Sequence, residues 1–210
     1  MIAVSQRRNS QRGNQLVEAA VCFLPMMALF FGLIDVCFAL AIQGVLSSAT
    51  RAASRWAITY PGSYNGASCT SQATCIEQVT QTNAVGFLAG TKISYVTVNY
   101  YVPNNLTTPV SSCSNGTCTP SATVTLPYTY TVYTDTGSTS ETITYANQPG
   151  NIVEVTIPSY PLIWMAPMAG YSAGTQVTDI NGHRGLGLTV SAATLDVLGG
   201  LPPGTAPPSP

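Results

Sequence analysis

The sequence predicts an α+β fold, in which a long N-terminal transmembrane helix precedes a small β-rich exported domain. Residues 19–42 are apolar apart from one acid, Asp35. Beyond residue 59 the composition changes to Thr, Ser, Tyr, Val, Gly and Asn, with apolar residues at every second position in several stretches. The first pattern is typical of a membrane helix and the second of half-buried strands.

Charge and length limit the classes of function. The 210 residues have a formal net charge of −1, and 7% of them are charged. Such a chain has no basic surface for nucleic acid, and its length suits one ordinary domain together with an anchor. We therefore expect no nucleic-acid partner.

The apolar stretch is long enough for one membrane crossing, because about 20 residues of helix span the hydrocarbon core. Arg7, Arg8 and Arg12 precede it in a short flank without an acid, which favours a cytoplasmic N-terminus and export of the rest. The alternative is a signal peptide cleaved near Ala39-Leu40-Ala41. However, the 24 residues of this stretch exceed the roughly 7–15 of a signal h-region. Membrane lipid is therefore an expected partner.

Helical spacing continues beyond the span. Apolar residues recur every three or four positions as far as Trp56, and Pro61-Gly62 then supplies a stop. We expect one helix over residues 14–58, about 65–70 Å long, with a bend near Pro25.

The exported domain is expected to cover residues 59–198. A hairpin turn is expected at residues 135–138, leading into Ile143 and Tyr145, and residues 72–89 form a weak candidate helix. The tail, residues 199–210, is rich in Pro and Gly and is expected to be disordered. Period-two alternation predicts strands within residues 96–102, 123–133, 151–161 and 186–192.

Four of the six cysteines lie beyond the span, as Cys69-x5-Cys75 and Cys113-x4-Cys118, each pair inside a Ser/Thr/Asn/Gly loop. Three pairings are possible. We expect the two local disulfides in an oxidising compartment, and cross-pairing of Cys69 with Cys113 or Cys118 is the alternative. A metal site is disfavoured, because the spacing exceeds C-x2-4-C and the single histidine, His183, lies in another segment.

The sequence offers no constellation for catalysis. One histidine, one lysine beyond the span and scattered carboxylates supply no set of nucleophile, base and orienting group, and no glycine loop could cradle a phosphate. His183 stands in Asn-Gly-His-Arg-Gly, a pattern typical of a surface loop. We expect no enzymatic activity, no cofactor and no metal.

The N-terminus carries a more specific pattern. A basic flank and Gly13 are followed five residues later by Glu18, and an apolar helix then carries an early proline and a late acid in Phe-Gly-Leu-Ile-Asp. Over about residues 7 to 58 this resembles the prepilin-like N-terminus of the TadE family, minor pilins of the bacterial tight-adherence pilus. The Thr-rich exported part with two cysteine pairs departs from the family's pattern.

The resemblance implies a prepilin-like leader, residues 1–13, cut between Gly13 and Asn14 by a prepilin peptidase. It further implies a single-pass protein of the bacterial inner membrane with a periplasmic C-terminal domain. Its implied partners are other pilin subunits and the inner-membrane pilus assembly machine, which would lead it toward the pilus at the cell surface. The alternative functions are a membrane-anchored adhesin or binding module with an uncut N-terminus and an exported enzyme.

Two acids in the apolar region need an explanation. After cleavage the α-amine of Asn14 and the carboxylate of Glu18 would be four residues apart, so they could pair within one chain or set the register between subunits. Snorkelling of Glu18 to the cytoplasmic surface is the alternative. Asp35 either marks the outer headgroup region or pairs with a neighbouring subunit across the face of Ala28 and Gly32.

Overall fold

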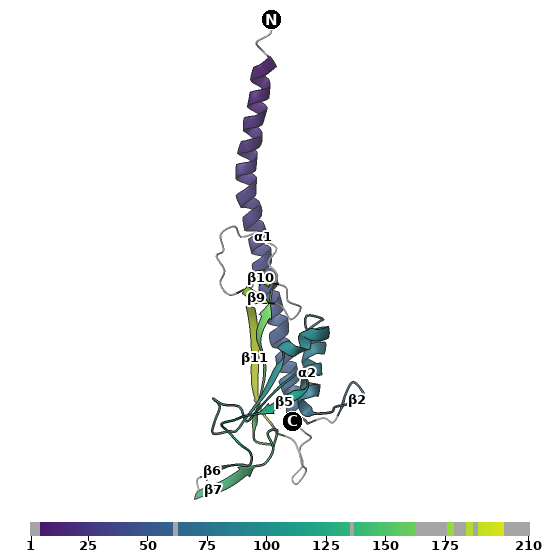
Figure 1. The fold of residues 1–210 in the computed structure, drawn as a ribbon, viewed down its shortest axis with the longest axis vertical. Coiled ribbons are helices and arrows are strands. Elements are labelled where there is room, and N and C mark those ends of the chain that lie inside the picture. The colour runs from purple at the N-terminus through teal and green to yellow at the C-terminus, as the bar shows by residue number, and fades with distance from the viewer. Residues whose placement is uncertain are drawn as a thin grey trace.

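The structure is a computed structural model that describes residues 5–60, 63–134, 137–162, 176–178, 184–186 and 189–199. One long helix, α1 (Ser5–Ile58), dominates it, and the other described elements lie along the C-terminal part of this helix (Figure 1). The predicted α+β fold, a long apolar helix followed by a β-rich domain, is confirmed.

Helix α1 runs without interruption past Pro25, although proline lacks the N–H that would bond to the carbonyl of Val21. The helix ends at Ile58, as the sequence predicts, and Tyr60 then turns the chain with a φ of 47°. It begins at Ser5, ahead of the expected position 14.

A five-stranded antiparallel sheet forms the centre of the domain, in the order β11-β8-β3-β4-β5. Strand β8 shows why this sheet forms: Val153, Val155 and Ile157 alternate with partly exposed residues and are fully buried. The strands of the sheet are β3 (Thr97–Tyr101), β4 (Ser111–Ser114), β5 (Thr117–Pro120), β8 (Ile152–Pro161) and β11 (Thr189–Val197).

The core lies between this sheet and two helices, α1 and α2 (Gln72–Asn83). Ser71 caps the N-terminus of helix α2, since its side chain accepts the backbone N–H of Thr74 and so satisfies one donor of the first turn. The C-terminal part of α1 contributes small and branched side chains to the core, namely Ile42, Leu46, Ala49, Ala53 and Ala57. The small side chains of these alanines let α1 and α2 approach each other closely.

The remaining elements are short. A β6–β7 hairpin projects from the end of the domain far from the N-terminus of α1 (Figure 1). These elements are β1 (Ser63–Tyr64), β2 (Ala67–Ser68), the 3-10 helix η1 (Gly90–Tyr95), β6 (Tyr128–Thr134), β7 (Gly137–Ile143), β9 (Gln176–Thr178) and β10 (Arg184–Leu186).

Several predicted boundaries differ from the structure. The candidate helix over residues 72–89 stops at Asn83, because Val85 and Gly86 adopt positive φ angles that break a right-handed helix. The strand expected from residue 123 begins at Tyr128, one residue after Pro127. The last strand runs over residues 189–197 rather than 186–192. His183 and residues 200–210 lie outside the described residues.

The two local cysteine pairings are present as expected, but three of the four cysteines lie in a helix or strands rather than in loops. Cys113 and Cys118 are directly opposed partners of strands β4 and β5, and Cys75 lies inside α2. Strands β4 and β5 escaped prediction because their residues are mostly Ser and Thr, so that no apolar alternation marks them. Asn115-Gly116 forms the turn between them, with φ angles of 52° and 73°.

Candidate functional site

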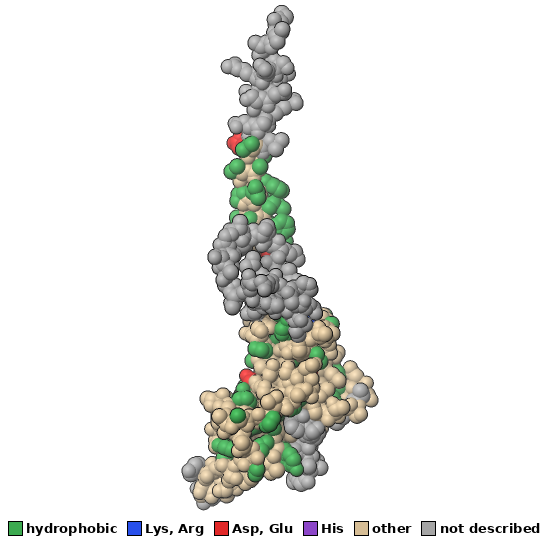
Figure 2. All heavy atoms as spheres, in the orientation of Figure 1, with side chains coloured by type: hydrophobic (Ala, Val, Ile, Leu, Met, Phe, Trp, Pro, Cys, Tyr) green, Lys and Arg blue, Asp and Glu red, His purple; other side chains and the backbone are tan. Residues whose placement is uncertain are grey.

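The N-terminal half of α1 exposes a continuous apolar surface. Val17–Ile58 is the one helix of the described residues that is long and apolar enough to cross a membrane. Figure 2 shows apolar side chains along the part of the helix that stands clear of the domain. The large exposed side chains are Val17, Val21, Phe23, Leu24, Met26, Leu29, Phe30, Leu33, Val36, Phe38 and Leu40.

The helix changes character after Leu40. That leucine is 62% exposed, whereas Ile42 and Leu46 are buried in the domain core at 2% and 0% exposure. The exposed part from Val17 to Leu40 is about 36 Å long at 1.5 Å per residue, enough for a hydrocarbon core of about 30 Å. An apolar surface of this kind is costly in water and is suited to lipid or to other apolar helices.

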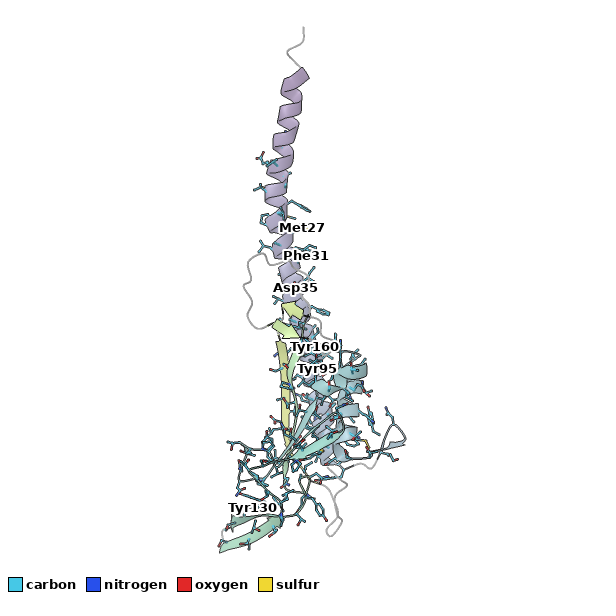
Figure 3. The ribbon with its side chains drawn as sticks, in the orientation of Figure 1. Met27, Phe31, Asp35, Tyr95, Tyr130 and Tyr160 are labelled. Atoms are coloured by element: carbon cyan, nitrogen blue, oxygen red, sulfur yellow. A yellow bond between two sulfur atoms is a disulfide. The ribbon has the colours of Figure 1, made fainter. Side chains whose placement is uncertain are left out.

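The two predicted acids lie in different surroundings. Glu18 is exposed near the start of the apolar part, and Asp35 is only 7% exposed. Seventeen residues of helix, about 25 Å, separate them, so the structure does not bring them together. Met27 and Phe31, which precede Asp35 at intervals of four residues on the same face, are also partly buried (Figure 3). Asp35 is therefore largely covered within a single chain.

Gly13 and Asn14, the residues of the predicted cleavage site, lie within α1. The Asn14 side chain is outside the described part of the structure, so the fold adds no geometry to that prediction.

The four cysteines beyond α1 form two bonds, Cys69 to Cys75 and Cys113 to Cys118. The first bond ties the segment ahead of α2 to its first turns, and the second joins β4 to β5. Cys22 and Cys37 are free and exposed on α1.

Sequence reasoning missed a buried carboxylate between these two disulfides. Glu77 of α2 is 2% exposed, and its two carboxylate oxygens accept the backbone N–H of Gly116 at 3.2 and 2.9 Å. Burial raises the pKa of Glu77 to about 7, while the hydrogen bonds from the backbone of Gly116 and Asn115 act in the opposite direction. In the sequence, the signal for this buried carboxylate was an acid next to Ile76, on the apolar face of a candidate helix.

Polar contacts fix the domain to the end of α1. Gln72 is buried, donates to the carbonyl of Ala57 at 3.1 Å, and accepts from the hydroxyl of Tyr100 at 3.3 Å. That carbonyl lies in the last turn of α1, where no helical donor remains for it. The hydroxyl of Tyr60 likewise donates to the carbonyl of Asn147 at 2.5 Å. Helix α1 and the domain therefore form one connected unit.

A further polar contact joins α1 to the sheet. The hydroxyls of Thr50 in α1 and Thr194 in β11 are 2.9 Å apart.

Within the described residues, no group of three or more His, Cys, Asp or Glu side chains is placed to hold a metal ion. The chemically distinctive surface of this part of the chain is the apolar helix.

Comparison with known proteins gives one match. Residues 13–55 match the family described as TadE-like protein, which confirms the resemblance that the sequence pattern indicates. The match covers about a fifth of the chain and coincides with α1. Searches of curated proteins and of solved structures found no match. The chain thus carries a TadE-like segment on an N-terminal apolar helix, a combination that fits a protein associated with the tight-adherence pilus.

Proposed function

We propose that this protein is a minor pilin or pilus-assembly protein of a bacterial tight-adherence pilus. Helix α1 holds it in the inner membrane or in the filament, with the N-terminus in the cytoplasm and the β-rich domain in the periplasm. The observation that carries the proposal is the coincidence of the TadE-like match, residues 13–55, with a helix whose apolar side chains are exposed as far as Leu40.

The proposal includes processing between Gly13 and Asn14. A glycine has no side chain to obstruct an extended conformation in a protease groove, and Arg12 favours placement of the site at the cytoplasmic face. Cleavage creates an α-amine four residues before Glu18. A prepilin peptidase is therefore the first proposed partner, and pilin subunits and the inner-membrane assembly machine are the others.

The exposed helix supports a role in assembly because the same apolar surface suits two successive environments. In the membrane its side chains contact lipid, and in a filament they pack against the helices of neighbouring subunits. Its rigid connection to the domain through Gln72 and Tyr60 means that the position of the helix sets the position of the domain.

The intact mass of the protein extracted from membranes of pilus-competent cells tests this proposal. We expect a chain that lacks residues 1–13, and we expect Gly13→Leu to remain uncut and to be absent from pili. Gly44→Leu is the matched control, because Gly44 is exposed on the same helix and a β-carbon added there would meet no atom within 4 Å. This control should be processed normally.

A full-length N-terminus in such cells, together with wild-type behaviour of Gly13→Leu, would overturn the processing step. The membrane-anchored adhesin with an uncut N-terminus would then be the better description. The same measurement therefore separates the two functions.

A further inference from the structure

An aromatic contact joins the domain to the apolar part of α1. The rings of Phe38 in α1 and Phe87 are 6.4 Å apart between centroids and meet edge to face at 71°. Phe87 belongs to the loop at residues 84–89, which connects α2 to η1. Because Phe38 is 45% exposed beside Leu40, this loop lies where the exposed part of the helix ends.

Val85 in this loop is in an unusual position. It has a φ of 49° and is 76% exposed. A β-branched residue is strained in the left-handed region, and an exposed valine gains nothing from burial that would offset the strain. Such an outlier is a reason to look for a functional environment.

Two other turns of the domain show what the same backbone normally carries. Asn65-Gly66 has φ angles of 49° and 80°, and Asn115-Gly116 has 52° and 73°, whereas Val85-Gly86 has 49° and 85°. Asparagine tolerates this conformation far better than valine does. The turn nearest the apolar half of α1 therefore differs from its counterparts by an apolar side chain directed outward.

Aromatic and basic groups surround the same end of the domain. The hydroxyl of Tyr160 donates to the carbonyl of Phe87 at 2.9 Å, and the rings of Tyr160 and Tyr95 are 5.9 Å apart. The amine of Lys92 lies 5.7 Å from the centroid of the Tyr160 ring. Figure 3 places Tyr95 and Tyr160 at the end of the domain nearer Asp35 and Tyr130 at the opposite end.

With α1 inserted as proposed, helix geometry would put this group at a membrane surface. If the span begins near Val17, the 21 residues to Phe38 cover about 32 Å, close to the thickness of a hydrocarbon core of about 30 Å. Phe38 and its partner Phe87 then lie at the outer boundary of that core. Tyr95 and Lys92 are both partly exposed, and tyrosine and lysine are favoured at this depth because an apolar stem lies in lipid while a polar tip reaches the headgroups.

We propose that Val85, Phe87 and Ala89 of this loop, together with Tyr95 and Lys92, form a second membrane contact on the periplasmic face of the membrane that α1 crosses, and that the buried Tyr160 holds Phe87 in place from within the domain. Val85 and Phe87 enter the boundary between headgroups and acyl chains, and Lys92 faces phosphate headgroups. This contact fixes the tilt of the domain against the bilayer before assembly. It rests on the proposed membrane insertion of α1 and adds a lipid partner for the domain itself.

Depth-dependent quenching in vesicles tests the contact. The full chain with Cys22→Ala, Cys37→Ala and Val85→Cys is labelled with a fluorescent thiol reagent and reconstituted in phosphatidylcholine with a minority of phosphatidylglycerol. Brominated acyl chains in these lipids serve as the quencher. The matched control is Asn65→Cys, since Asn65 has the same φ and is exposed but follows the far end of α1, 20 residues or about 30 Å beyond Phe38.

We expect lipid quenching at Val85 to exceed quenching at Asn65 by about twofold or more. A label on Ala89, which is exposed in the same loop, should be quenched as well and covers the case in which Val85→Cys folds poorly. Equal, weak quenching at residues 65, 85 and 89 would overturn the proposal.

Native Cys22, labelled in a Cys37→Ala chain, reports on α1 itself. Quenching at Cys22 without quenching at residues 85 and 89 would refute the second contact alone. Absence of quenching at Cys22 would instead refute the membrane insertion on which the proposed function depends.

Discussion

The carboxylate of Glu77 in α2 accepts the backbone N–H of Gly116, at the turn of the β4–β5 hairpin, with a shortest distance of 2.9 Å. This contact joins the two disulfide-bonded parts of the domain, because Cys75 is two residues before Glu77 and Cys113 and Cys118 close the hairpin. An anion nearly removed from water is costly unless donors surround it. Burial of Glu77 therefore opposes the ionisation of its carboxyl group.

The pH dependence of stability should reveal this opposition. Burial raises the pKa of Glu77 from 4.5 to about 7, so between these values the folded state binds a proton that the unfolded state has lost. The unfolding free energy therefore falls as pH rises through this window, by on the order of 2 kcal/mol. Denaturant titration of the full chain in detergent, followed by near-ultraviolet circular dichroism, measures it.

Glu77→Gln should remove this pH dependence, because the amide remains neutral and its oxygen still accepts from Gly116. Glu154→Gln is the matched control: Glu154 accepts from Asn99 and Tyr101 on the partly exposed face of the sheet. An unchanged pH profile in Glu77→Gln would show that Glu77 is not the group responsible.

Gln72→Ala should destabilise the domain by about 2–4 kcal/mol, since it leaves the Ala57 carbonyl and the Tyr100 hydroxyl without their partner in a buried site. Gln78→Ala in the same helix is the control, because the Gln78 side chain is exposed. Thermal unfolding of both variants in one detergent checks the difference. Equal stability of the two variants would mean that water or another group replaces Gln72.

The disulfides should contribute unequally. The two disulfides have sequence separations of six and five residues. A disulfide that closes so short a loop stabilises the folded state by at most about 2–3 kcal/mol. The loss should be smaller for Cys113→Ser with Cys118→Ser, because the Asn115-Gly116 turn and Glu77 already hold that hairpin closed. Cys69→Ser with Cys75→Ser should cost more. Peptide mapping without reduction checks the connectivity, and a peptide joining Cys69 to Cys113 or Cys118 would contradict it.

The fold could be predicted where apolar spacing is regular. The alternation of Val153, Val155 and Ile157 marks β8, and the long apolar run marks α1, because burial acts directly on these side chains. Strands β4 and β5 are held by cross-strand pairing and the Cys113–Cys118 bond rather than by apolar alternation. A pattern based on hydrophobicity therefore does not reveal them.

The candidate site likewise has a part that the sequence predicts and a part that depends on tertiary packing. A carboxylate within an apolar run identifies Glu18 and Asp35 from the sequence alone. The burial of Asp35 to 7% exposure depends on tertiary packing, as does the contact of Glu77 with Gly116, 39 residues away. The aromatic contact of Phe38 with Phe87 was missed for the same reason, since it joins α1 to a loop beyond α2.

Glu18 provides the sharpest test of assembly. Glu18 is exposed, and Phe38 and Ile42, which join α1 to the domain, lie 20 and 24 residues further along the helix, so Glu18→Ala should leave the domain fold unchanged. An acid in a membrane helix costs about 2.5–3.5 kcal/mol on insertion scales, and its removal should not impair insertion either. If the chain is cut after Gly13 as proposed, the variant loses a partner for the α-amine of Asn14, in its own chain or in the next subunit.

We therefore expect Glu18→Ala to be exported, inserted and processed at normal levels but to be depleted from sheared pili, as measured by immunoblotting of membrane and pilus fractions. Glu18→Gln keeps the shape and removes the charge, so it should share the defect if pairing with the amine sets the register. Gln43→Ala, exposed on the same helix, is the control and should assemble normally. Wild-type incorporation of Glu18→Ala would refute the register role and leave snorkelling to the cytoplasmic surface as the explanation for this acid.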